Sequence, residues 1–119
     1  MLIDLSDENY VESVENFQEA IFIDFYSPSC GPCQEVLPLL PHIDSYFDSE
    51  VMVAKVNVAQ NPKLAKKFEI QSVPFCVSID KKTKMIKDYE LGPASTDRYI
   101  RMIEKARGKK GGLFGWLFS

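Results

Sequence analysis

The stretch IFIDFYSPSCGPC, residues 21–33, contains the strongest structural signal in the chain. Its first half belongs to a run of apolar, β-branched and aromatic residues, AIFIDFYS (20–27), which is typical of a strand buried on both faces. Asp24 is the only charged residue in that run. The second half places Cys30 and Cys33 three positions apart, at the start of a helical pattern. The stretch therefore predicts a buried strand, then two cysteines, then a helix.

The remaining apolar patterns predict alternating helices and strands. Helical spacing extends over Asp7–Phe17, Cys30–Phe47, 61–68 and Thr96–Arg107, and short apolar runs predict strands over 51–58, 75–79 and 85–91. Pro38 and Pro41 fall inside the second helix and predict a kink there. The last two strands are close enough in sequence to form an antiparallel hairpin. This order predicts an α/β fold, with a central mixed sheet of about four to five strands flanked by about four helices on both faces.

Composition and charge limit the classes of function. The 119 residues are 45% hydrophobic and 26% charged, and no apolar run is long enough to span a bilayer. Residues 1–50 contain eleven acidic and no basic side chains, whereas residues 51–119 contain all fourteen Lys and Arg and six acidic ones. These halves form either two solvated faces that attract each other or a dipolar surface that selects partners by charge. The net charge of −3 gives little support to nucleic acid as a partner.

The cysteine pair has three candidate roles: a zinc clamp, a structural staple or a redox couple. Three cysteines are too few, and odd in number, for a disulfide framework. A closed zinc site needs about four ligands, and only Cys30, Cys33, the distant Cys76 and the lone His42 are available. A metal shared between two chains is a weaker alternative. A Cys-x-x-Cys between a strand and a helix in an alternating pattern favours the redox couple.

The redox chemistry assigns a role to each residue of the motif. A helix start lowers the pKa of a cysteine thiol, so we expect Cys30 to attack the substrate disulfide and Cys33, one turn further, to resolve the mixed disulfide. Gly31 allows close approach at the turn. Pro32 lacks the N–H that the first helical turn leaves unsatisfied, and it stiffens the pair.

The quoted stretch resembles the active-site segment of the thioredoxin family, down to the Gly-Pro between the cysteines. VAKVNVAQNPKLAKKFEIQSVP (53–74) is similar to the strand, helix and proline loop that follow in that family, and Gly92 matches a glycine after the hairpin. The resemblance covers roughly residues 2 to 107. It implies the thioredoxin fold and reduction of protein disulfides, with a reduction potential of about −270 mV for thioredoxin itself. It also implies regeneration by a thioredoxin reductase that draws on NADPH, with no cofactor bound to this chain.

The resemblance also implies further site residues. Asp24 is expected behind Cys33, where it shuttles the proton of that thiol, with Lys55 nearby; the alternative is a buried structural ion pair between Asp24 and Lys55. Thioredoxins hold the proline that matches Pro74 in the cis form, facing the cysteine pair, whereas a trans proline that starts the strand is the alternative. The expected substrate surface consists of Ser29, Gly31, Pro32, Val73, Pro74, Phe75 and Gly92.

Several positions depart from the family pattern. Ser29 stands where thioredoxins usually have Trp, Tyr26 where Trp is common, Gln34 where Lys is frequent, and Phe75 where Thr is usual. These changes bear on the substrate range and the potential rather than on the reaction. Cys76 is interpreted as a small buried apolar residue, with a third reactive thiol as the alternative.

The end of the chain lies beyond the resemblance. We expect a thioredoxin-like domain over residues 1–107 and a Gly-rich, apolar tail over residues 108–119. The tail could contact a membrane surface, enter a groove on a partner, or fold back on the domain. Its large apolar residues are Leu113, Phe114, Trp116, Leu117 and Phe118.

The acidic start of the sequence lacks the layout of a secretory signal, so we expect the cytoplasm. Besides a general protein-disulfide reductase, two hypotheses remain. One is a specialised redox partner tethered by its tail. The other is an adaptor that uses the fold only for binding, with incidental thiols.

Overall fold

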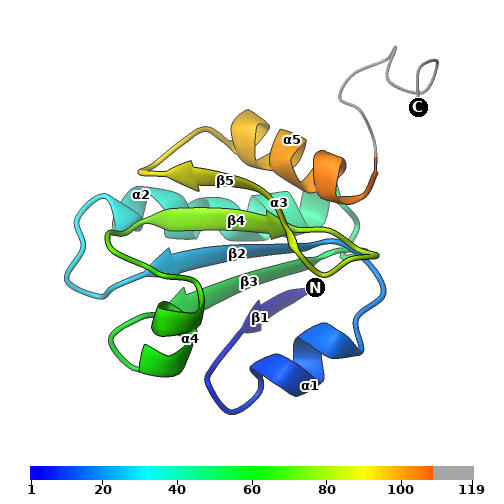
Figure 1. The fold of residues 1–119 in the computed structure, drawn as a ribbon. Coiled ribbons are helices and arrows are strands. Elements are labelled where there is room, and N and C mark those ends of the chain that lie inside the picture. The colour runs from blue at the N-terminus through cyan, green and yellow to red at the C-terminus, as the bar shows by residue number, and fades with distance from the viewer. Residues whose placement is uncertain (109–119) are drawn as a thin grey trace.

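The structure is a computed structural model that describes residues 1–108. They form a five-stranded sheet in the order β1-β3-β2-β4-β5 (Figure 1). The strands are β1 (Leu2–Asp4), β2 (Ile21–Tyr26), β3 (Met52–Asn57), β4 (Phe75–Ile79) and β5 (Ile86–Leu91). β1, β3 and β2 are parallel, whereas β4 is antiparallel to β2, and β5 is antiparallel to β4. The expected mixed sheet and its terminal hairpin are confirmed.

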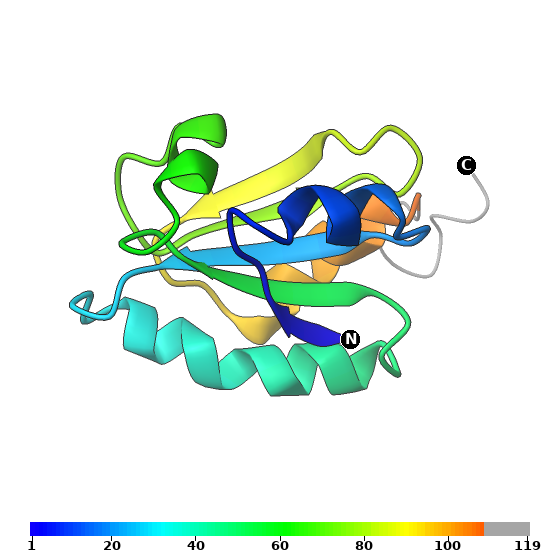
Figure 2. The same ribbon diagram turned by 90° about the horizontal axis from the view of Figure 1, so that it is seen from below.

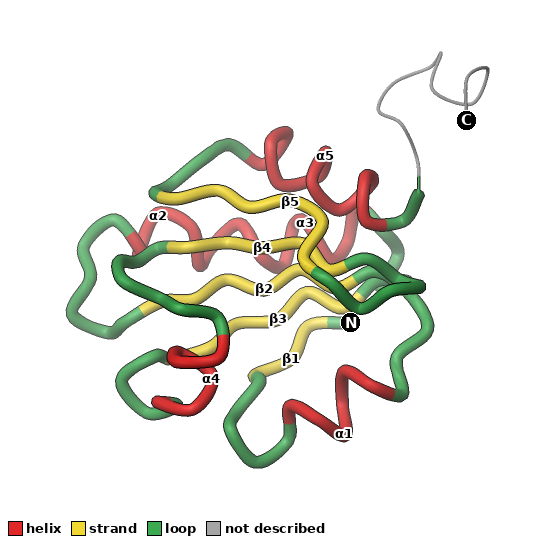
Figure 3. Tube along the Cα trace, viewed as in Figure 1, coloured by secondary structure: helices red, strands yellow, loops and turns green. Residues whose placement is uncertain are grey.

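Helices cover both faces of this sheet, as Figures 1 and 2 show and as the secondary-structure colouring of Figure 3 makes plain. They are α1 (Tyr10–Glu15), α2 (Cys33–Val36), α3 (Leu40–Tyr46), α4 (Pro62–Lys67) and α5 (Thr96–Ala106), with a short 3₁₀ helix, η1 (Leu37–Leu39), between α2 and α3. α1 and α4 lie on one face, and α2, α3 and α5 lie on the other. The expected layered α/β arrangement is therefore confirmed. Within residues 1–108, no helix has the length and apolar character needed to cross a membrane.

The N-terminal part differs from the expectation in two ways. β1 was not expected, because it has only three residues and its central position alone is partly buried. It forms by parallel pairing with the edge of β3, from Leu2 opposite Val53 to Asp4 opposite Lys55. α1 has six residues and is shorter than the expected Asp7–Phe17.

The helix expected over Cys30–Phe47 is divided into three segments. Regular α-helical pairing is interrupted at the prolines, since Pro38 lies within η1 and Pro41 lies in the first turn of α3. The expected start at Cys30 is wrong. The helix begins at Cys33 with Pro32 as its N-cap, after a turn in which the Cys30 N–H donates to the Ser27 carbonyl at 3.1 Å. Both active-site cysteines therefore stay at the junction of β2 and α2, but Cys30 precedes the helix.

The core consists of one cluster on each face of β2. Ile21, Ile23 and Phe25 point toward α1 and α4, whereas Phe22 points toward α3 and α5, where its ring centroid lies 5.2 Å from that of Tyr99. Burying a Phe side chain fully stabilises the fold by roughly 3 kcal/mol. Because side chains alternate along a strand, Asp24 points to the same face as Phe22, toward the helices that follow the cysteines.

Candidate redox site

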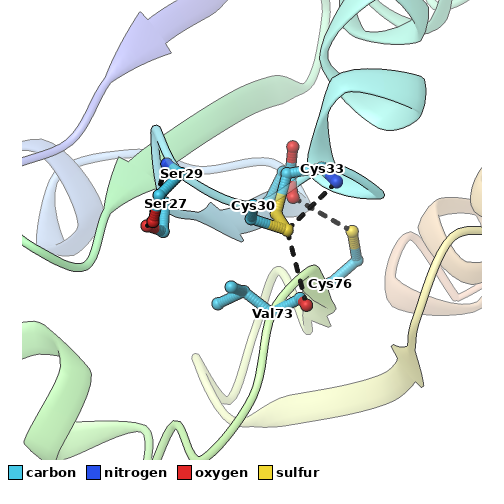
Figure 4. Close-up of a disulfide and its surroundings, with 7 residues drawn as sticks. Ser27, Ser29, Cys30, Cys33, Val73 and Cys76 are labelled. Atoms are coloured by element: carbon cyan, nitrogen blue, oxygen red, sulfur yellow. Dashed lines mark hydrogen bonds between the residues drawn. A yellow bond between two sulfur atoms is a disulfide. The ribbon is translucent and has the colours of Figure 1, made fainter.

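The cysteine motif forms a disulfide between one accessible and one buried residue (Figure 4). The Cα atoms of Cys30 and Cys33 are 5.3 Å apart. Cys30 is half-buried, whereas Cys33 is completely buried. The backbone N–H of Cys33 points at the Cys30 sulfur with an N···S distance of 3.1 Å. This donor favours a negative charge on Cys30 once the disulfide is reduced, which is the effect expected from a helix start.

The turn around the pair is open to solvent. Ser29, Gly31 and Pro32 are all exposed. The Ser29 hydroxyl lies 3.1 Å from the Ser27 hydroxyl, so it forms a local hydrogen bond where thioredoxins usually place an indole ring. Cys30 is therefore bordered by small and polar groups on this side.

The loop before β4 lies directly beside Cys30. The Val73–Pro74 peptide bond is cis, and the Val73 carbonyl oxygen is 3.6 Å from the Cys30 sulfur (Figure 4). Gly92, which has a φ of 84°, donates its N–H to the Pro74 carbonyl at 2.8 Å. Phe75 is half-buried, and its ring centroid lies 5.8 Å from that of Tyr89. The structure thus brings the Val73–Pro74 loop to Cys30, although it lies more than forty positions away from Cys30 in sequence, and Gly92, just after β5, holds that loop.

A groove of about 190 Å³ continues from this loop. Its apolar walls are Ile70, Phe75 and Leu91, and its polar lining comes from the loop residues just before Val73. The sequence analysis included Phe75 in the substrate surface but missed Ile70 and Leu91. The alternation of β5 is the signal that would have placed Leu91 on the side of Phe75, its register partner.

Asp24 is a fully buried carboxyl group in the central strand. Its Oδ1 accepts a hydrogen bond from the Cys76 thiol at 3.5 Å, and its Oδ2 has no hydrogen-bond partner within residues 1–108. Burial raises the pKa of Asp24 to about 7, while the Cys76 hydrogen bond and the charge of Lys55 act in the opposite direction. A carboxyl group that titrates near neutral pH can exchange a proton with a neighbouring thiol.

Lys55 is next to Asp24 in the sheet register but forms its ion pair elsewhere. Its Nζ lies 3.6 Å from the Asp4 carboxylate and 5.9 Å from the centroid of the Tyr26 ring. Within the described residues, Asp24 has no ion pair. The alternative of a buried Asp24–Lys55 ion pair is therefore not what the structure contains.

Cys76 is completely buried, as the interpretation of a core residue predicts. Burial, and next the charge of Asp24, raise the pKa of its thiol well above the usual range. Its hydrogen bond to Asp24 was not expected. Sequence reasoning had no strand register that would place Cys76 opposite Asp24.

The candidate metal ligands do not come together within the described residues. His42 is exposed on α3. Residues 1–108 contain no group of three or more His, Cys, Asp or Glu side chains that could hold a metal ion. The expectations for the tail over residues 108–119, including Leu113 to Phe118, fall on residues outside the described part of the chain, apart from Gly108.

A half-exposed cysteine, a buried partner one turn away and a cis-proline loop against the first sulfur define a protein dithiol–disulfide oxidoreductase. The family model described as thioredoxin matches residues 1–105. The chain belongs to the thioredoxin family, and its sheet with helices on both faces is the thioredoxin fold.

Individual relatives agree with this assignment. The chain is 34% identical over 73 residues to the thioredoxin of Buchnera aphidicola, a match covering 61% of this chain and 68% of the relative. It is 34% identical over 70 residues to the thioredoxin of Synechocystis sp., covering 59% and 65%. It is also 33% identical over 72 residues to the bifunctional thioredoxin reductase/thioredoxin of Mycobacterium leprae, covering 60% of this chain and 16% of that protein. The matches thus span about two thirds of the length of the two thioredoxins.

Proposed function

We propose that this protein reduces disulfide bonds in other proteins, with Cys30 as the nucleophile and Cys33 as the resolving thiol. The observation that carries the proposal is the difference in exposure within the pair, since Cys30 is accessible and Cys33 is not. The Cys33 N–H also points at the Cys30 sulfur and supports a thiolate there. A substrate disulfide can therefore reach Cys30 first.

The reaction has two exchange steps. The Cys30 thiolate attacks one sulfur of the substrate disulfide, so that a mixed disulfide forms and the other substrate sulfur leaves as a thiolate, which takes up a proton. The Cys33 thiolate then attacks the Cys30 sulfur. This step forms the Cys30–Cys33 disulfide and releases the second substrate thiolate, so two electrons pass from the pair to the substrate.

The second step requires that Cys33 lose its proton in a buried environment, and we assign Asp24 as the acceptor. Cys33 and Asp24 lie on the same side of the sheet. Asp24 points to the same face as Phe22, and Val36, one turn after Cys33 in α2, packs in the cluster that contains Phe22. A pKa of about 7 and a carboxyl oxygen without a partner within residues 1–108 suit Asp24 to that transfer. Lys55 acts as a positioning residue, because its charge favours the ionised form of Asp24.

The substrate is proposed to bind as an extended segment along the cis-proline loop. The segment contacts the open turn on one side of Cys30 and the loop on the other, and an apolar substrate side chain enters the groove beside Phe75 and Leu91. The contact surface consists of Ser29, Gly31, Pro32, Val73, Pro74, Phe75 and Gly92.

We propose a thioredoxin reductase as the electron donor. The reductase joined to thioredoxin in the Mycobacterium leprae relative supports this pairing. A reducing couple of this kind suits the cytoplasm, where structural disulfides are rare. The free thiol of Cys76 agrees with such a compartment.

We further propose a domain boundary at residue 107, because the family match stops at residue 105 and α5 ends at Ala106. Residues 108–119 then form a separate tail.

The test is reduction of insulin with a thioredoxin reductase and NADPH, comparing the wild type with two single variants. Cys30→Ser is expected to abolish reduction, whereas Cys33→Ser is expected to stop at a mixed disulfide through Cys30, detectable by mass spectrometry. Undiminished activity of Cys30→Ser overturns the proposal. If that variant also keeps its binding to partner proteins, an adaptor role becomes the better account.

A further inference from the structure

The strand register aligns five polar residues in one row across the sheet. Neighbouring strands place Asp4 opposite Lys55, Lys55 opposite Asp24, Asp24 opposite Cys76, and Cys76 opposite Glu90. Register partners on adjacent strands point to the same face, which here is the face covered by α2, α3 and α5. The two ends of the row are partly or fully exposed, but Asp24 and Cys76 are completely buried. Two buried polar groups side by side in the middle of a sheet are costly unless they bind each other.

The other polar side chains around the Asp24–Cys76 pair have partners elsewhere in the structure. Lys55 of β3 pairs with Asp4, and Glu90 of β5 pairs with Arg98 at 2.8 Å. The Tyr99 hydroxyl of α5 accepts the Ala94 N–H at 2.9 Å, and Cys33 of α2 is in the disulfide. Within the described residues, the only hydrogen bond to the Asp24 carboxyl group comes from Cys76.

We propose that Cys76 is a positioning residue for the resolving step: its S–H donates to Oδ1 of Asp24 and leaves Oδ2 as the oxygen that accepts the Cys33 proton. This inference rests on the proposed role of Asp24 as proton acceptor. Without the Cys76 donor, both oxygens of a buried carboxylate would lack a partner among residues 1–108. Cys76 thus selects which oxygen is free and favours the ionised form that can accept a proton.

The environment of Cys76 keeps it in the form that this role requires. Burial and the neighbouring Asp24 raise the pKa of the thiol, so it stays protonated and remains a donor. The hydrogen bond with the Tyr99 hydroxyl acts in the opposite direction and lowers that pKa, but burial has the largest effect. A thiol that is both protonated and inaccessible to solvent is a poor nucleophile, which argues against Cys76 as a third reactive cysteine.

Three substitutions separate the hydrogen bond from packing. Cys76→Val has a side chain close in size to Cys but no donor, and Cys76→Ser retains a donor. Ser78→Ala is the matched control, because Ser78 lies on the same strand and face, is also completely buried, and has no hydrogen bond from its hydroxyl within residues 1–108. Cys76→Ala replaces Cys76→Val if the larger side chain prevents folding.

The first readout is the titration of the Asp24 carboxyl carbon by NMR in the oxidised full-length protein, which does not depend on activity. Loss of a weak neutral donor to a carboxylate is expected to raise the pKa of Asp24 by about half to one unit in Cys76→Val. Cys76→Ser is expected to stay at or below the wild-type pKa, and Ser78→Ala to match it. An Asp24 pKa in Cys76→Val equal to that of the wild type overturns the inference.

The second readout is the pH profile of the resolving step, measured as decay of the mixed disulfide with a small aromatic disulfide. A protonated Asp24 cannot accept a proton, so the rise in rate with pH should follow the pKa of Asp24. In Cys76→Val the rate near pH 6 is expected to fall about three- to ten-fold and recover at high pH. A purely structural Cys76 would lower the rate equally at all pH, which contradicts the inference. If the substitution shifts the NMR pKa of Asp24 but not the pH profile of the resolving step, the hydrogen bond from Cys76 is supported. That result would overturn instead the role of Asp24 as proton acceptor.

Discussion

Replacing Asp24 by asparagine removes the buried carboxyl group of β2, and its effect on stability is expected to depend on pH. In the folded protein the pKa of Asp24 is raised from 3.8 to about 7, chiefly because burial disfavours the charged form. The folded state therefore binds more protons than the unfolded state between these two values. Folding is favoured by this group at acid pH, and that stability is lost as the pH rises from about 4 to about 7.

The magnitude follows from the size of the shift. From 3.8 to about 7 is about three units, and each unit corresponds to about 1.4 kcal/mol, so the upper limit is about 4 kcal/mol. Relaxation around the charge reduces the effect, and we expect about 2 to 4 kcal/mol. The asparagine of Asp24→Asn cannot ionise. As the pH rises from acid to alkaline, the free energy of unfolding of this variant should therefore increase by that amount relative to that of the wild type.

The assay is urea unfolding of both proteins across that pH range, with the disulfide intact. Asp4→Asn is a matched control, because Asp4 lies in the same polar row but its side chain is 77% exposed, so the same substitution should change the free energy of unfolding little. A stability difference between Asp24→Asn and the wild type that is the same at all pH would refute the reasoning. It would mean that the pKa of Asp24 is the same in the folded and the unfolded protein.

Four further substitutions test other parts of the fold by urea unfolding. Arg98 lowers the pKa of Asp88 to about 2, so Asp88→Asn should cost about 1 kcal/mol at neutral pH, with the loss vanishing as the pH falls from about 4 toward 2; a loss independent of pH contradicts this. Gly92→Ala should cost about 1 kcal/mol because of the positive φ, whereas Gly31→Ala, which meets no atom within 4 Å, should cost little; equal losses contradict this. Phe22→Ala should cost about 3 to 5 kcal/mol, and a loss below about 1 kcal/mol would place Phe22 outside the core.

The strands at the centre of the sheet could be predicted from sequence because their signal is local. β2 is a run of β-branched and aromatic residues, β3 is a mostly apolar run, and most positions of both strands are buried on both faces. β1 could not be predicted in this way, since three residues carry no periodicity and their pairing depends on β3. The start of the active-site helix was placed three residues early, because apolar spacing includes Cys30 while the Gly31–Pro32 turn delays regular helical hydrogen bonding.

The site was predictable where it depends on a motif and not where it depends on register. Cys30 and Cys33 stand together in sequence, and the approach of Pro74 followed from the family resemblance. The pairing of Lys55 with Asp4, and of Cys76 with Asp24, depends on which residues of neighbouring strands stand opposite each other. One residue of slip in that register would move each side chain to the other face of the sheet, so sequence alone could not specify these contacts.

The central claim is that Cys30 and Cys33 form a working reducing couple. The most direct measurement is a titration of the full-length protein in glutathione buffers, with each cysteine followed by alkylation and mass spectrometry. The account predicts that Cys30 and Cys33 oxidise together in one two-electron step, with a midpoint near or below about −250 mV, while Cys76 stays reduced. A midpoint between about −120 and −180 mV would indicate an oxidant or isomerase and contradict the account, as would the absence of any disulfide between Cys30 and Cys33.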